Sequence, residues 1–247
     1  MNELLGKYAV ITGAAGGIGA ATAMTFAKEG AKGIVIADLN IEKAEETSEL
    51  ISNETGCMCI AEKVNVADYS DIKKLFEVAA KKFESLDILV NGAGICPVGS
   101  IEEIGDIEWD MVMNINLRSA YLCSREAFTK MKQRKYGKVI NISSISGRIG
   151  GIATGVNYAV SKGGIIALTM SLAKAVGPFN INVNCIAPGF IDTQMTKNFN
   201  HFDPETVPLR RIGTPEDVAD VIQFLASERS RYITGVTIDI NGGVFMG

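Results

Sequence analysis

Histidine is nearly absent from the 247 residues, because His201 is the only one. A Ser-His-Asp hydrolase would have to use His201 as its base, which weakens that class. The cysteines are few, scattered and odd in number, a pattern typical of free thiols in a reducing compartment. Since no second Cys pair accompanies Cys57 and Cys59, we expect no metal site. The five are Cys57, Cys59, Cys96, Cys123 and Cys185.

A strong charge of one sign and a long apolar run are also missing. The net charge is −4, which argues against nucleic acid as a partner. No apolar run reaches the ~18 residues of a membrane span. The start of the chain leads into a strand pattern without the basic and apolar regions of a secretory signal. We therefore expect a cytoplasmic protein with no membrane partner, and the 47% of hydrophobic residues is enough for a substantial core.

Strand-like and helix-like segments alternate along the chain. Continuous apolar strands indicate burial on both faces, as in a parallel sheet between helices. We predict one α/β domain over residues 1–247, a doubly wound Rossmann fold with a seven-stranded parallel sheet and a substrate loop at about 190–213. Expected strands are 8–12, 33–38, part of 57–66, 86–91, 137–143, 181–187 and 235–240. Expected helices run from the glycine-rich turn to 28, over 41–53, 70–83, 106–134 and 157–176, and from 215 onward.

A glycine-rich turn follows the first expected strand. Gly13, Gly17 and Gly19 would let a pyrophosphate approach backbone N–H groups at a helix N-terminus. Asp38 ends the second strand, where a carboxylate can bond both adenosine ribose hydroxyls and would repel a 2′-phosphate. No Arg or Lys lies between Thr12 and Gly19 or directly after Asp38. We therefore expect NAD rather than NADP. The alternatives are an ordinary glycine turn and an aspartate that caps the next helix.

Tyr158 and Lys162 lie four residues apart and would project from one face of a helix. A fixed ammonium there can lower the pKa of the phenol. Free tyrosine has a pKa near ~10. Lys162 and an oxidised nicotinamide at ~5 Å would each contribute ~3 kcal/mol toward the phenolate at an effective dielectric of ~20. With Ser143 and Ser144 just upstream, the pair suggests an acid/base site beside a hydride carrier.

In this combination the chain resembles the classical short-chain dehydrogenase/reductase family from Lys7 to Gly243, including members similar to 3-oxoacyl-carrier-protein reductases. The resemblance implies Tyr158 as general acid/base and Lys162 as the group that lowers its pKa and binds the nicotinamide ribose. It also implies that Ser144 orients the substrate oxygen and that Asn116, after Trp109, holds a water. Ser143 and Ser146 are alternatives to Ser144.

The same resemblance implies the nucleotide contacts. Asn91-Gly-Ala-Gly94 is similar to the family's Asn-Asn-Ala-Gly motif, with glycine in place of the second asparagine, and Asn65-Val66 stands where an Asp-Val pair is usual. The implied cofactor residues are Gly13, Gly17, Ile18, Gly19, Asp38, Leu39, Asn65, Val66, Asn91, Ala93, Gly94, Tyr158, Lys162, Pro188, Gly189, Ile191 and Thr193.

The sequence says less about the substrate. Expected pocket walls at 94–99, 146–154 and 190–207 include Phe199, His201 and Phe202, which suggest an uncharged or weakly polar alcohol or ketone. Lid packing for the two aromatic rings and a solvent-facing histidine are the alternatives. We expect an NAD-dependent enzyme that interconverts a secondary alcohol and a ketone, of the polyol, hydroxy acid or hydroxysteroid type.

The alternative activity is 3-oxoacyl-[acyl-carrier-protein] reduction, whose enzymes the stretch 210–217 resembles. Against it stand the NAD preference expected from Asp38 and a basic cluster, Lys132, Arg134 and Lys135, at the end of only one helix. A remote alternative is a non-catalytic nucleotide-sensing module. The resemblance also implies a homotetramer built through the long helices after the fourth and fifth strands.

Overall fold

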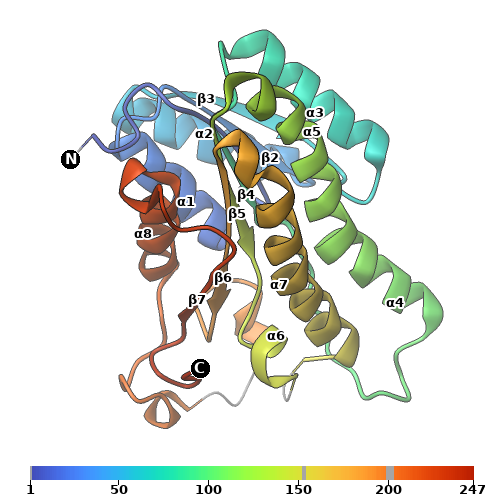
Figure 1. Cartoon of the computed structure of the whole chain (residues 1–247). Coiled ribbons are helices and arrows are strands. Elements are labelled where there is room, and N and C mark those ends of the chain that lie inside the picture. Colours follow the sequence, from blue (N-terminus) through green and yellow to red (C-terminus); the bar gives the residue numbers. More distant parts are fainter. Residues whose placement is uncertain (1, 152–153, 199–202) are drawn as a thin grey trace.

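The computed structural model describes residues 2–151, 154–198 and 203–247. Its centre is one seven-stranded sheet in the order β3-β2-β1-β4-β5-β6-β7, and all neighbouring strands are parallel (Figure 1). The predicted fold class is thereby confirmed. The strands are β1 (Tyr8–Thr12), β2 (Gly33–Asp38), β3 (Met58–Lys63), β4 (Ile88–Asn91), β5 (Gly137–Ile142), β6 (Ile181–Pro188) and β7 (Thr237–Ile240).

Helices cover both faces of the sheet (Figure 1). The face with α1 (Gly17–Lys28), α2 (Ile41–Thr55) and α8 (Pro215–Ala226) forms one apolar core. The opposite face, with α3 (Tyr69–Lys82), α5 (Ser119–Arg134) and α7 (Val156–Val176), forms a second core. The remaining α-helices are α4 (Asp106–Val112) and α6 (Ser146–Ile149). The short 3₁₀ turns are Gly177–Phe179, Thr196–Asn198, Pro204–Thr206 and Glu228–Ser230.

The continuous apolar strands serve both cores at once. In β1, Ala9 and Ile11 point to the α1 face, whereas Tyr8 and Val10 point to the α5 face. This alternation follows from the two-residue period of a strand. The chain proceeds from β1 outward to β2 and β3, and then returns to add β4 on the other side of β1. This reversal of direction leaves a crevice at the carboxyl ends of β1 and β4, where ligands of such sheets bind.

One expected helix differs from the prediction. The segment 106–134 is not continuous, because α4 and α5 are separated by a π-helical stretch, Met113–Arg118. There the N–H of Ser119 donates to the carbonyl of Asn114, five residues back. Such bulges are frequent at functional sites, and this one contains Asn116.

One helical segment among the described residues has the length and composition to cross a membrane, namely Val156–Phe179, with a mean hydropathy of 1.3. The segment contains Lys162 and Lys174, so it is not an uninterrupted apolar run. Within its most apolar 18 residues, 33% are buried in the chain. Ile165, Ile166 and Leu168 belong to a third, smaller apolar cluster, whereas Val160 and Met170 are exposed.

Candidate active site

A cavity of about 350 Å³ lies at the carboxyl ends of the central strands. Most of the residues implied for cofactor and chemistry meet there, although they come from six separate stretches of the chain. The predicted residues that line the cavity are Gly13, Gly17, Ile18, Gly19, Asp38, Gly94, Ser144, Tyr158, Lys162, Pro188, Gly189, Ile191 and Thr193.

The glycine-rich turn has the shape that a pyrophosphate needs. A Cβ on Gly13 would lie 2.8 Å from the backbone N and Cα of Ala93, and one on Gly19 would collide with the carbonyl oxygen of Gly13. Neither position tolerates a side chain, so the turn stays closely packed against the end of β4. The helix α1 begins here with no side chain capping its N-terminus. Its first N–H groups therefore face the cavity and suit an anion.

Asp38 is fixed beside this turn by two backbone hydrogen bonds. One carboxylate oxygen accepts from the N–H of Ala15 and the other from the N–H of Asn40, both at 3.0 Å. The cap of α2 is Asn40, whose side chain accepts from the N–H of Lys43. The alternative reading of Asp38 as the helix cap is thus not supported. A carboxylate with lone pairs still open at this edge of the cavity fits the hydroxyls of a ribose.

Tyr158 and Lys162 lie on the buried face of α7. The Lys162 ammonium is 5.6 Å from the centroid of the Tyr158 ring and donates to the carbonyl oxygen of Ile142 at 2.8 Å. Burial lowers the pKa of Lys162 from 10.5 to about 8. Burial also raises the pKa of Tyr158, an effect that the thiol of Cys96 adds to and a hydrogen bond with Ser144 opposes.

The expected depression of the Tyr158 pKa is therefore not seen in the polypeptide itself. Desolvation disfavours the phenolate more strongly than its surroundings favour it, and the same burial lowers the pKa of Lys162. The polypeptide alone therefore does not make the phenolate of Tyr158 more accessible.

The buried ammonium leads to a testable pH dependence. The folded pKa of Lys162 lies below that of the unfolded chain, so between pH 8 and 10.5 the unfolded chain binds one more proton than the folded one. Stability contributed through Lys162 therefore rises with pH in this window. Relative to Lys162→Met, we expect the wild type to gain about 2 kcal/mol of unfolding free energy between pH 7.5 and 9.5. Urea denaturation of both proteins measures this difference, in which other titrating groups cancel.

Lys174→Met is the matched control, because Lys174 is an exposed lysine on the same helix. Its difference from the wild type should stay constant across the same pH range. An equally constant difference for Lys162→Met would contradict a buried ammonium with a lowered pKa.

The three candidate serines are separated by their contacts. Ser143 lines the cavity, but its hydroxyl is engaged, since it donates to the carbonyl of Lys162 at 2.7 Å and so ties the segment after β5 to α7. Ser146 is not among the described lining of the cavity, and its hydroxyl accepts from Thr154 at 3.4 Å. Ser144 also lines the cavity, and a hydrogen bond with its side chain opposes the rise in the Tyr158 pKa. The geometry thus favours Ser144 as the serine beside the acid/base group.

Asn116 is buried in the π-helical stretch and holds the segment after β4. Its amide oxygen accepts from the N–H of Ile95, and its amide nitrogen donates to the carbonyl of Ile95, both at 2.9 Å. The nitrogen also donates to Ser161 at 3.0 Å. Both amide hydrogens are thus used, which leaves one lone pair on the oxygen for the water that the resemblance implies.

Five residues implied as cofactor contacts are absent from the described lining of the cavity: Leu39, Asn65, Val66, Asn91 and Ala93. Asn91 is a buried link whose amide nitrogen donates to Asn141 at 2.8 Å and to Ser124 at 3.1 Å. Asn65 accepts from the N–H of Ala67. Their contact with a nucleotide stays a prediction. The expected wall residues Phe199, His201 and Phe202 lie outside the described residues.

Sequence reasoning missed other residues of the lining, among them Gly16, Asn40, Lys43 and Gly92. Gly16 directly precedes α1 and was counted only as part of the turn. Lys43 lies in the first turn of α2, and its position after the cap Asn40 was the one available signal that its stem starts near Asp38.

Comparisons with known proteins agree with this geometry. Residues 13–245 match the family model described as Enoyl-(Acyl carrier protein) reductase. The chain is 38% identical to Nodulation protein G of Rhizobium meliloti (strain 1021) over the whole of both chains. It is 41% identical to the 3-oxoacyl-[acyl-carrier-protein] reductase FabG of Rickettsia conorii, again over the whole of both.

Solved structures show the same similarity. A short-chain type dehydrogenase/reductase from Mycobacterium marinum superposes with a TM-score of 0.95 at 27% identity, covering 100% of this chain and 98% of the other. A putative short-chain alcohol dehydrogenase from Sinorhizobium meliloti 1021 superposes with a TM-score of 0.93 at 34% identity, covering 98% of both. The chain therefore belongs to the short-chain dehydrogenase/reductase family and is an oxidoreductase.

Proposed function

We propose that this protein reduces the 3-oxo group of an acyl thioester to a hydroxyl, with a reduced nicotinamide dinucleotide as cofactor. Relatives of 37–41% identity that match nearly end to end are named 3-oxoacyl-[acyl-carrier-protein] reductases. The observation that carries the proposal is the meeting of Ser144, Tyr158 and Lys162 in one cavity beside the glycine-rich turn. In this arrangement the phenol of Tyr158 can give its proton to a carbonyl oxygen that Ser144 holds.

The proposed chemistry assigns each side chain one task. A reduced nicotinamide dinucleotide held at the glycine-rich turn and Asp38 would supply the hydride for the carbonyl carbon. Ser144 donates a hydrogen bond to the carbonyl oxygen and stabilises the negative charge that develops there. Tyr158 transfers its proton to that oxygen, which completes the alcohol. Lys162 would bind the nicotinamide ribose and stabilise the phenolate left behind, and Asn116 fixes the backbone of Ile95.

We also propose NAD(H) as the preferred cofactor. Asp38 is the observation that supports it, because two backbone N–H groups hold its carboxylate in place. A 2′-phosphate at ~5 Å from this charge would be repelled by ~3 kcal/mol at an effective dielectric of ~20.

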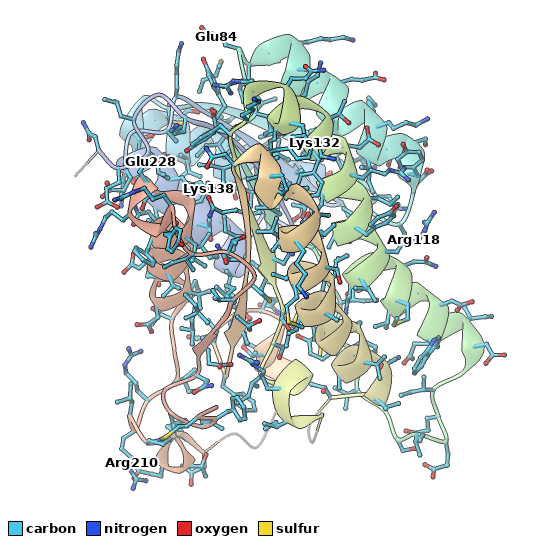
Figure 2. All side chains as sticks on the ribbon, in the orientation of Figure 1. Glu84, Arg118, Lys132, Lys138, Arg210 and Glu228 are labelled. Carbon is cyan, nitrogen blue, oxygen red and sulfur yellow. The ribbon has the colours of Figure 1, made fainter. Side chains whose placement is uncertain are left out.

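A second candidate activity is the oxidation of a secondary alcohol of the polyol, hydroxy acid or hydroxysteroid type, which was our first expectation from the sequence. Asp38 favours it, because it is expected to select NAD(H). The basic cluster that would bind an acidic carrier protein also favours it, because two of its side chains already have partners within the chain. Arg134 is engaged by Asp87 at 2.8 Å, and the Lys132 ammonium lies over the ring of Phe179. Figure 2 shows Lys132 at the end of α5 that is remote from α6.

A substrate panel separates the two activities. NADH and NADPH oxidation would be measured with acetoacetyl-carrier protein, acetoacetyl-CoA, a ketosugar and a ketosteroid. We expect kcat/KM for a thioester to exceed that for any unactivated ketone by at least about tenfold. A ketosugar or ketosteroid as the best substrate would replace the proposal by the second candidate. Tight NADH binding without turnover of any substrate would indicate a nucleotide sensor.

We further propose a homotetramer in the cytoplasm. The apolar residues Tyr121, Val160 and Met170 are exposed on α5 and α7, and 33% of the most apolar 18 residues of Val156–Phe179 are buried in the chain. A second copy packed on this face would cover them. All five cysteines are free thiols, which fits a reducing compartment. A monomer in sedimentation at micromolar concentration would contradict the assembly.

A further inference from the structure

We propose that Lys43 raises the affinity of this site for a nucleotide with a 2′-phosphate. Its ammonium places a positive charge beside the glycine-rich turn, which has no basic residue of its own. The inference rests on the proposed nucleotide-dependent function and concerns the choice between NAD(H) and NADP(H). It names a residue that the sequence did not single out, since Lys43 lies five positions after Asp38 and on a different element.

The position of the ammonium is the first observation. A Cβ on Gly16 would lie 3.1 Å from the Lys43 Nζ and 3.3 Å from its Cε. The end of the lysine therefore occupies the space that a side chain at position 16 would take. Gly16 and Lys43 line the same cavity as Asp38, so the charge is presented to the ligand site rather than to bulk solvent alone.

The second observation is how near this charge is to the group that would hold the ribose. Asp38 accepts from the N–H of Ala15, the residue that directly precedes Gly16. A phosphate attached to a hydroxyl held by Asp38 would thus lie next to the ammonium above Gly16. The repulsion from Asp38 and the attraction to Lys43 would act on the same phosphate, and both would fall off over similar distances.

The third observation is that Lys43 is available for this role. Within the part of the chain that the structure describes, its ammonium makes no hydrogen bond or ion pair. Its backbone N–H donates to the side chain of the cap Asn40. This bond fixes the backbone of Lys43, and its long side chain extends toward the glycine-rich turn. An unpaired ammonium breaks no ion pair within the protein when it binds a phosphate, and lysine is a common phosphate ligand.

Together these placements predict a site with two opposing charges. Asp38 favours the free ribose hydroxyl, and Lys43 reduces the discrimination that Asp38 alone would impose. The cofactor preference is therefore smaller than expected from Asp38, and it depends on a residue of α2.

The test uses nucleotides without nicotinamide, so that it does not depend on catalysis. Adenosine 2′,5′-bisphosphate and 5′-AMP would be titrated calorimetrically into the wild type, Lys43→Met and Lys43→Arg. We expect Lys43→Met to weaken the bisphosphate about tenfold and 5′-AMP less than twofold, and Lys43→Arg to retain both. Lys28→Met, an exposed lysine in the last turn of α1, is the matched control and should change neither.

A charge moved to the turn gives an independent check. Gly16 has an extended backbone, with φ of −170°, and among the described residues only the Lys43 side chain lies within 4 Å of its Cβ position. Gly16→Lys in the Lys43→Met background should therefore fit and restore bisphosphate binding. Circular dichroism would verify the fold of each variant.

The outcomes separate this inference from the proposed function. Equal losses for the two nucleotides, no loss for either, or a wild type that binds 5′-AMP but not the bisphosphate would each overturn the role of Lys43. A wild type that binds neither nucleotide would overturn the nucleotide site itself. Binding as expected without thioester reduction would overturn the proposed activity and leave Lys43 in place.

Discussion

Tyr158→Phe is expected to lower kcat for carbonyl reduction by about a thousandfold while leaving the affinity for NADH within about twofold. The substitution removes one oxygen and keeps the ring that packs in the site. General acid catalysis by a positioned side chain contributes roughly 10²–10⁴ in rate. The value expected here lies within that range because no other described group of the cavity combines a proton to give with a hydrogen bond to Ser144.

The measurement is steady-state reduction of acetoacetyl-CoA together with NADH binding by fluorescence. Tyr232→Phe is the matched control, since Tyr232 is fully exposed and the same oxygen is lost there. It should keep wild-type activity. A Tyr158→Phe enzyme with more than a tenth of the wild-type kcat would show that the proton comes from another group, such as a water.

The sequence predicted the parallel sheet because strands that are buried on both faces appear as continuous apolar runs. Apolar residues such as Val10 and Ile11 succeed one another without polar interruption, and only a central parallel strand accommodates that pattern. The start of β4 was less accurate. Leu86 and Asp87 belong to the approach to the strand, where the buried Asp87 accepts from the N–H of Tyr8 and pairs with Arg134. A strand-like pattern does not show such a tertiary anchor.

The sequence predicted which residues form the site better than it predicted their pKa values. Motif spacing is a local property, so it identified Tyr158, Lys162 and Asp38. The direction of the Tyr158 pKa depends on how completely the surrounding elements exclude water, which spacing does not encode. Asn116 was found by resemblance, whereas the π-helical bulge that buries it was not, because residues 113–118 contain neither glycine nor proline.

Gly13→Ala is expected to destabilise the fold by about 3 kcal/mol and to weaken nucleotide binding at the same time. Gly13 has φ of +69°, and a side chain in this region costs about 1–2 kcal/mol. The added Cβ would also lie 2.8 Å from backbone atoms of Ala93. The backbone after β4 cannot move away as a flexible side chain could. Overpacking therefore adds about 1–3 kcal/mol to the loss of unfolding free energy. The melting temperature should fall by roughly 6–12 °C for a chain of this size.

Gly56→Ala isolates the contact from the backbone strain. Gly56 has nearly the same φ, +74°, but no atom of the residues that the structure describes lies within 4 Å of its Cβ position at the end of α2. It should therefore lose only the 1–2 kcal/mol of strain and bind NADH as the wild type does. Thermal unfolding and NADH titration of the two variants give the comparison. Equal losses of stability would mean that Ala93 moves to accommodate the new methyl group. Glycine would then be required at position 13 only by its positive φ, and not by close packing against the end of β4.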